Sequence, residues 1–360
     1  MKKRRFFSSL LLFALLLSCF SLYACKKSEN ESNNSKKTEK FSEYSLDYFD
    51  TATTITGYAE TQEEFDKISQ DILLKLSEYH KLYTIYHRFE GLENLCTVNE
   101  LTDGAHRTVT VDQKIIDLLL YAKEIYAKTN GKTNIAMGSV LSIWHDYRTE
   151  GMNEPAEAKL PPIELLTEAA KHTNIDDVII DIEKNTVFLS DPKMTLDVGA
   201  VAKGYAVEMI ARSLEESGVT GYVLNVGGNV RTIGIKGDGN PWVAGIENPK
   251  EDENEPYIAY LNLSGESLVT SGSYQRYYTV DGKNYHHIID PATNMPAERY
   301  LSVSIVCKDS GLADALSTAL FCMSYEEGVA VLEAIDGAEA IWVFSDGTRK
   351  ESSGFSSYVK

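Results

Sequence analysis

The second half of the chain most strongly restricts the fold. From residue 222 to 307 it consists of short runs rich in β-branched and aromatic residues, separated by Gly, Asn, Asp and Pro. Such spacing predicts antiparallel strands, because parallel strands need a long crossover between them, usually a helix. We therefore expect an antiparallel sheet rather than repeated βαβ units. The expected strands span 222–226, 230–235, 242–247, 257–263, 267–269, 274–280, 284–289 and 301–307.

Helices are expected on both sides of this segment. Thr61 with Glu64, and Ser324 with Glu327, have the spacing of a capping box, and Thr110 with Gln113 repeats it. The fold class is therefore predicted as α+β, with largely antiparallel sheets flanked by helices. Helices are predicted over 61–86, 110–128, 161–172, 200–218, 312–323 and 324–335, and further strands over 44–58, 179–182, 186–189 and 340–344.

The stretch LDVGAVAKGY, residues 196–205, is predicted to run from a buried strand through a turn into a helix. Lys203 then lies in the first helical turn, where a cation is unfavourable unless an anion is nearby. Gly199 and Gly204 remove side chains, as in turns that hold phosphate. A solvated lysine beside packing glycines remains an alternative.

Glycine and serine residues interrupt two other predicted strand ends. Gly227 and Gly228 indicate either a close approach to a ligand or a plain hairpin turn. Ser271 and Gly272 follow a predicted strand and offer a hydroxyl and N–H groups suited to phosphate oxygens. Neither segment alone distinguishes a ligand-binding site from an ordinary turn.

Two adjacent histidines precede an Asp-Pro turn. Such a position suits proton transfer near neutral pH, although a structural role is also common. Neighbouring residues of a strand point to opposite faces, so only one of His286 and His287 can face a given site.

Asp314 and Thr318 lie four residues apart in a predicted apolar helix, and therefore on one face of it. Buried oxygen groups of this kind suit a hard cation such as Mg²⁺. Capping by Asp314 and a backbone bond from Thr318 form the alternative.

The first residues are predicted to be a targeting signal. Four basic residues precede an apolar run from 6 to 17, which is too short for a comfortable membrane span. Leu22 and Ala24 before Cys25 resemble a bacterial lipobox, with Cys19 as a weaker candidate and a plain signal peptide as the alternative. The predicted organisation is a signal at 1–24, a disordered tether at 25–42 and a domain at 43–360.

Charge restricts the partners. After removal of the signal, 31 basic residues face 53 acidic ones, a net charge of −22. This excess argues against nucleic acid and anionic lipid as partners, because both need a basic patch. Any anionic ligand must be held locally. The three cysteines of the domain have no metal-ligand spacing and require no disulfide; they are Cys96, Cys307 and Cys322.

Together these segments resemble the ApbE family of FAD:protein FMN transferases, over about residues 49–344. The resemblance rests on LDVGAVAKGY (196–205), NVGGN (225–229), WVAGIENP (242–249), TSGSY (270–274), HIIDPATNMP (287–296) and ADALSTAL (313–320). It implies a T-fold-like catalytic unit of two joined halves. Asn294 replaces the family's usual glycine, and residues 130–135 depart from its D-G-x-F-D-P segment.

The resemblance also assigns roles. It implies magnesium ligands at Asp314, Thr318 and the carbonyl of Ala200, and phosphate contact at Lys203. His287 matches the histidine assigned to proton transfer. The flavin-lining segments are implied to include Gly227, Gly228, Ser271 and Gly272.

The reaction that the resemblance implies transfers FMN from FAD to a threonine hydroxyl of a target protein and releases AMP. The implied partners are membrane-associated redox subunits on the extracytoplasmic face, where the enzyme would be lipid-anchored. An FAD pyrophosphatase, a non-catalytic FAD-binding lipoprotein and a lipoprotein that captures another solute remain alternatives.

Overall fold

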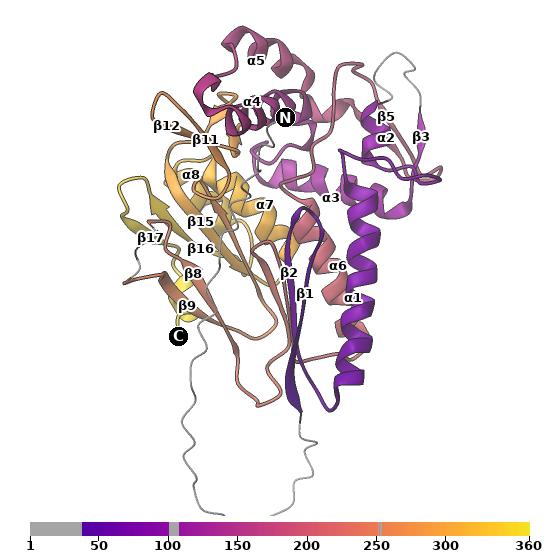
Figure 1. Cartoon of the computed structure of the whole chain (residues 1–360), viewed down its shortest axis with the longest axis vertical. Helices are drawn as coiled ribbons and strands as arrows, with labels where there is room; N and C mark the ends of the chain where they lie inside the picture. The colour runs from indigo at the N-terminus through magenta and orange to yellow at the C-terminus, as the bar shows by residue number, and fades with distance from the viewer. Residues whose placement is uncertain (1–37, 101–107, 251, 253) are drawn as a thin grey trace, which may run out of the picture. The chain divides into compact units, whose positions relative to one another are not determined.

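Eight strands form the central sheet, in the order β1-β2-β6-β7-β10-β15-β16-β17 (Figure 1). The computed structural model describes residues 38–100, 108–250, 252 and 254–360. Every neighbouring pair in this sheet is antiparallel, which confirms the predicted α+β class. The strands are β1 (Glu39–Tyr48), β2 (Thr51–Ala59), β6 (Tyr222–Val226), β7 (Asn229–Ile233), β10 (Ser267–Gly272), β15 (Tyr300–Cys307), β16 (Glu339–Phe344) and β17 (Arg349–Glu351).

Helices cover one face of this sheet. Aliphatic and aromatic side chains of α1 and α6 form one core with β2, β6 and β7, and those of α7 and α8 form another with β15 and β16. The two cores place α6 beside α7, and these two helices carry three of the predicted site residues, Lys203, Asp314 and Thr318. The covering helices are α1 (Gln62–Tyr83), α6 (Ala202–Glu216), α7 (Ser310–Phe321) and α8 (Tyr325–Glu333).

The hairpin of β8 (Trp242–Glu247) and β9 (Tyr257–Leu263) packs on the other face of the sheet. Its apolar residues join Leu268, Val306 and Ile341 in a separate core. The helices and this hairpin therefore sandwich the central strands.

The remaining elements extend the molecule beyond the sheet. Figure 1 shows α4 and α5 close to the hairpin of β11 and β12, and Trp144 of α4 shares a core with Tyr278 of β11. The bounds are α2 (Leu95–Glu100), α3 (Gln113–Lys128), α4 (Gly138–Asn153), α5 (Ile163–Ala169), β3 (Val109–Thr110), β4 (Val178–Asp181), β5 (Thr186–Leu189), β11 (Tyr277–Val280), β12 (Lys283–His286), β13 (Ile289–Asp290) and β14 (Met295–Pro296).

Three sequence predictions of local structure are wrong. The strand expected over 44–58 is the hairpin β1–β2, because Phe49 and Asp50 adopt φ values of 53° and 50° and turn the chain. The cap of α3 is Asp112, whose carboxylate accepts the N–H of Lys114, rather than Thr110. Residues 194–198 are extended but form no strand.

The amide of Asn99 explains why residues 194–198 remain extended. Its Oδ1 accepts the N–H of Leu196 at 2.7 Å, and its Nδ2 donates to the Leu196 carbonyl at 2.9 Å. One side chain thus satisfies the backbone groups that a neighbouring strand would bind.

Other predictions have mixed outcomes. The capping box of Ser324 and Glu327 is present at α8, and Asn294 adopts a left-handed φ of 58°. Strand β1 begins at Glu39, before the predicted domain start at residue 43.

Cys19 and Cys25 lie outside the described residues. Cys96, Cys307 and Cys322 are buried and unpaired. Within the described ranges, no helix has the length and apolar character needed to span a membrane.

Candidate functional site

The crossing of α6 and α7 is built around Gly204. A Cβ atom at this position would lie 2.4 Å from both Asp314 Cβ and the Ser310 carbonyl oxygen, so only glycine allows this approach. The N–H of Gly204 donates to Asp314 Oδ2 at 2.9 Å. The first turn of one helix is therefore bonded directly to a carboxylate of the other.

Ala200 lies in the turn that leads into this helix. Helix α6 begins at Ala202 with Val201 as its N-cap, so Gly204 is in the first turn, where an N–H has no partner within the helix. The carboxylate of Asp314 supplies that partner. The carbonyl predicted as a backbone ligand is therefore in the turn directly before the helix start that Asp314 contacts.

Asp314 is almost fully buried, with 5% of its surface exposed. Burial raises the pKa of its carboxyl group, although Lys203, Gly204 and Asn229 act in the opposite direction. The Nζ atom of Lys203 lies 3.7 Å from Asp314 Oδ2. The two residues that the sequence assigns to cation and phosphate binding are therefore neighbours.

Further oxygen atoms surround this carboxylate. Asn229 begins β7, and its buried Oδ1 has no hydrogen-bond partner within the described residues. Thr318 lies one turn after Asp314, and its hydroxyl is 3.4 Å from Ser271 Oγ. Carboxylate, hydroxyl, amide and carbonyl oxygens are the donors that Mg²⁺ accepts, so these residues fit a hard cation. Among the described residues, no group of three or more His, Cys, Asp or Glu side chains is placed to hold a metal ion. The oxygen ligands named here include only one such side chain, that of Asp314.

The predicted flavin-lining segments have different geometries. Gly227 and Gly228 connect β6 to β7 with φ values of 57° and 90°, as a two-residue hairpin turn requires. Ser271 and Gly272 lie within β10, where they pair with Val303 and Ser302, so the prediction that they follow a strand is wrong. Ser271 Oγ lies 2.8 Å from Ser317 Oγ and therefore faces α7.

The two histidines have different surroundings. His286 is buried, its Nε2 lies 2.6 Å from the carbonyl oxygen of Ala297, and its Nδ1 accepts the N–H of Ile288. A carbonyl can only accept, so Nε2 carries the proton and both ring nitrogens are engaged. His286 therefore has a structural role.

His287 is half-buried and follows β12. Its Nδ1 lies 3.2 Å from the carbonyl oxygen of Arg276, which assigns the proton to Nδ1 and leaves the Nε2 lone pair free. Burial, together with the positive charge of Arg148, lowers the pKa of His287 to about 3. The ring is thus a neutral imidazole that can accept a proton at Nε2.

Shared electrostatic neighbours connect His287 to the α6–α7 crossing. Arg148 acts on the pKa of both His287 and Asp197, while Lys203 acts on that of both Asp197 and Asp314. Burial raises the pKa of Asp197, which lies in the extended segment before α6. His287, Asp197, Lys203 and Asp314 therefore belong to one electrostatically connected group.

The sequence reasoning missed Asp197 and Arg148. Asp197 lies within the quoted segment LDVGAVAKGY, so its carboxylate beside Lys203 was a usable signal. Arg148 follows Trp144 by one helical turn in a segment predicted only as a short helix to residue 147. Its position near His287 depends on the packing of α4 against β11, which one sequence does not reveal.

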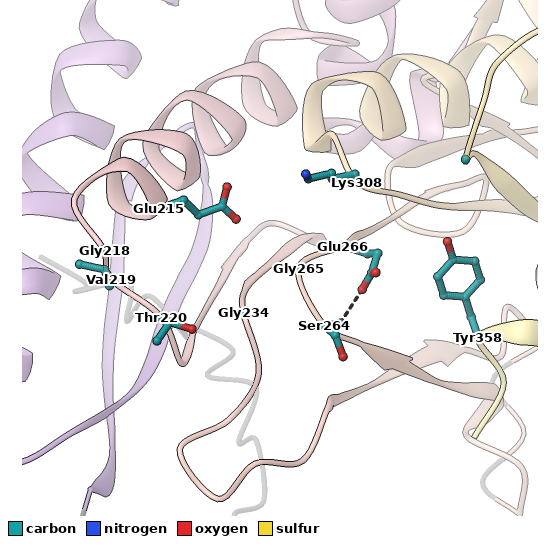
Figure 2. A pocket seen from close by; sticks show the side chains of 11 residues that line it. Glu215, Gly218, Val219, Thr220, Gly234, Ser264, Gly265, Glu266, Lys308 and Tyr358 are labelled. Carbon is teal, nitrogen blue, oxygen red and sulfur yellow. Dashed lines mark hydrogen bonds between the residues drawn. The ribbon is translucent and has the colours of Figure 1, made fainter. Parts of the chain in front are cut away.

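A separate cavity of about 670 Å³ lies at the opposite end of the sheet (Figure 2). Gly234, which lines it, follows β7, whereas Asn229 of the site begins that strand. Likewise Glu266 precedes β10, and Ser271 lies near its end. This cavity is therefore distinct from the candidate site.

Comparisons with known proteins agree on one family. A model of the ApbE family matches residues 49–342. An FAD:protein FMN transferase of Klebsiella pneumoniae is 32% identical over 283 residues, covering 76% of this chain and 85% of that protein. An FAD:protein FMN transferase of Haemophilus influenzae is 28% identical over 357 residues, covering 98% of this chain and 97% of that protein. The crystal structure of the ApbE protein of Thermotoga maritima aligns with a TM-score of 0.76 at 27% identity, covering 90% of this chain and 100% of that one.

Proposed function

The chain belongs to the ApbE family, and from this membership we propose that it is an FAD:protein FMN transferase. In the proposed reaction, a threonine hydroxyl of a target protein attacks the phosphorus of the FMN half of FAD. A bond forms from the threonine oxygen to phosphorus, and the bond from phosphorus to the bridging oxygen breaks. AMP leaves with that electron pair, and the threonine proton passes to the enzyme.

We assign a Mg²⁺ site to Asp314, Thr318 and the Ala200 carbonyl. Support comes from the buried carboxylate, the hydroxyl one turn later and the position of Ala200 in the turn directly before α6. When bound, the ion would neutralise charge on phosphate oxygens. Lys203, with its ammonium group 3.7 Å from Asp314, would contact a phosphate beside it.

We assign proton transfer to His287. Threonine is a poor nucleophile at neutral pH, so a nearby base must accept its proton as the new bond forms. The free Nε2 of His287 suits this role, because the Arg276 carbonyl fixes the proton on Nδ1. Gly227, Gly228, Ser271 and Gly272 are proposed to line the flavin.

The observation that carries this proposal is the bond from the Gly204 N–H to Asp314. It joins two segments that lie 110 residues apart in the sequence and brings Lys203 near the buried carboxylate of Asp314. A metal and a phosphate contact side by side are what a diphosphate substrate requires.

Mass spectrometry tests the proposed reaction. The domain is incubated with FAD, Mg²⁺ and a flavoprotein domain that carries an acceptor threonine. We expect an FMN-sized mass increase on that threonine, together with AMP. An identical reaction without acceptor distinguishes transfer from FAD hydrolysis. FMN and AMP formed at the same rate with or without acceptor, and no labelled protein, would contradict the proposal.

We further propose lipid attachment at Cys25 and an acceptor among membrane-associated redox subunits on the extracytoplasmic face. The lipobox-like residues before Cys25 support the first part, and family membership supports the second. Replacement of Cys25 by alanine should release the protein from the membrane fraction. Retention of the variant in the membrane would exclude this cysteine as the anchor.

A further inference from the structure

Arg148 forms no ion pair with any carboxylate of the described residues. Its guanidinium lies 3.3 Å from Nδ1 of His145, one turn earlier on α4. Within the part of the chain that the structure describes, no carboxylate lies within 4 Å of this guanidinium, although the chain has a large excess of acidic residues. The side chain is half-buried, so water compensates its charge only in part.

A second cation increases this deficit of negative charge. Arg276, which precedes β11, acts on Arg148 as a like charge, whereas the carboxylate of Asp197 partly offsets it. Burying a cation without a partner is costly, and this cost is removed when an anion binds. The pair of arginines is therefore suited to an anionic ligand.

The location indicates which anion. Arg276 holds the imidazole of His287 through its backbone carbonyl, and the guanidinium of Arg148 is among the charges that act on that imidazole. Lys203, which is paired with Asp314 at the α6–α7 crossing, acts on Asp197 as Arg148 does, so Asp197 is a shared neighbour of the two groups. An anion at Arg148 would therefore lie beside the base, and a phosphate at Lys203 beside the cation-binding carboxylate.

We propose that Arg148, with Arg276, forms a subsite for the phosphoryl group that is transferred, the phosphate of the FMN half of FAD. This inference rests on the proposed function and adds to it a division of the diphosphate between two sides of the site. The AMP phosphate lies on the side of Lys203, and the FMN phosphate lies on the side of Arg148.

The chemistry of arginine suits this role. A guanidinium binds two phosphate oxygens at once through parallel N–H groups, and it stays charged at any working pH. It would stabilise negative charge on the equatorial oxygens while the threonine oxygen attacks. The bound phosphate would in turn separate Arg148 from the imidazolium that forms on His287, so that two like charges do not face each other.

Binding of the two product nucleotides tests the division. We expect Arg148→Gln to weaken FMN binding by about 10- to 100-fold, as loss of a charge-assisted bidentate contact does. AMP binding should stay unchanged. Arg148→Lys keeps the charge but loses the two parallel N–H groups of the guanidinium, so it should recover only part of the FMN affinity. Arg349→Gln, which removes an exposed ion pair with Glu255, is the matched control and should change neither.

Titration calorimetry with FMN and with AMP gives the affinities, and thermal unfolding checks that each variant is folded. If Arg148→Gln does not fold, the comparison of Arg148→Lys with the wild type decides. A loss of AMP affinity, an equal loss for both nucleotides, or no loss would overturn the subsite. If the wild type labels an acceptor and Arg148→Gln keeps its FMN affinity, only the proposed subsite is wrong. If the wild type binds neither FMN, AMP nor FAD, the proposed function is wrong as well as the subsite.

Discussion

The two sides of the candidate site differ in the charge they carry. One side holds a buried carboxylate, and the other holds a guanidinium with no carboxylate close by. At the α6–α7 crossing, the carboxylate of Asp314 is so deeply buried that its pKa is raised even with Lys203 at 3.7 Å. At the end of α4, the guanidinium of Arg148 has no carboxylate within 4 Å in the described chain, and the pKa of His287 is lowered to about 3. The first side is suited to a cation and the second to an anion.

This difference shows that neither side is arranged for stability alone. Asp314 has one cation nearby, Lys203, and its pKa is still raised, whereas Arg148 has no carboxylate within 4 Å in the described chain. A diphosphate with its divalent ion supplies both missing charges at once. The predictions that follow alter one side at a time.

Removing the negative charge of the first side should have the largest effect. Asp314→Asn keeps an oxygen for the Gly204 N–H but loses the charge that attracts a divalent ion. A bound metal ion contributes several kcal/mol to phosphoryl transfer, so we expect FMN transfer to fall by at least about 10³-fold and to lose its dependence on Mg²⁺. Rates measured across a magnesium titration test this, with the exposed Asp336→Asn as control. Full magnesium-dependent activity in Asp314→Asn would rule out the metal site.

Removing the base of the second side should have the next largest effect. His287→Gln should still bind FAD but transfer FMN about 10²- to 10⁴-fold more slowly, the usual contribution of a general base. The neighbouring His286 provides the matched comparison, because both its ring nitrogens bond within the protein. His286→Gln should lower the unfolding temperature and leave most of the transfer rate. The assignment would be reversed if His286→Gln stopped transfer and His287→Gln did not.

Separating the two helices should weaken the first side without changing its charge. In Gly204→Ala, the added methyl group must move Asp314 or the Ser310 backbone, since the present distance is 2.4 Å. Overpacking of this kind costs about 1 to 3 kcal/mol of unfolding free energy. Denaturant unfolding measures that loss, and Mn²⁺ titration should show weaker metal binding. Gly328→Ala, in helix α8, adds a methyl group 3.3 Å from its nearest neighbouring atom and at an ordinary φ, so it serves as a control for the steric effect.

The smallest expected effect is a change in one titration curve. Arg148→Gln removes a positive charge that disfavours the imidazolium, so the pKa of His287 should rise from about 3 towards its ordinary value. The His286 pKa, which burial lowers without a contribution from Arg148, should stay where it is. NMR titration of the ring protons without nucleotide follows both residues. An unchanged His287 curve would show that Arg148 does not act on the base.

Much of this site could be predicted from the sequence because its parts are local patterns. Asp314 and Thr318 share a helix face by their spacing, and Lys203 precedes Gly204 at a helix start. The alternation of side chains along a strand also predicted that only one histidine faces the site. These inferences need no knowledge of which elements meet.

The remaining features depend on contacts between distant segments. Arg148 reaches the site only because α4 packs on β11, and the Gly204 N–H finds a partner only because α6 crosses α7 at Asp314. Asn99 holds residues 194–198 in an extended form without a strand partner, whereas the apolar pattern alone predicted a strand. Tertiary hydrogen bonds replaced the local preference in each case.

A crystal structure with FAD and Mn²⁺ in place of Mg²⁺ tests the central claim most directly. We predict an anomalous peak for the metal beside Asp314 and Thr318, with the diphosphate extending from Lys203 to Arg148 and the FMN phosphorus beside Nε2 of His287. A metal bound elsewhere, or a diphosphate that contacts neither Lys203 nor Arg148, would contradict the account.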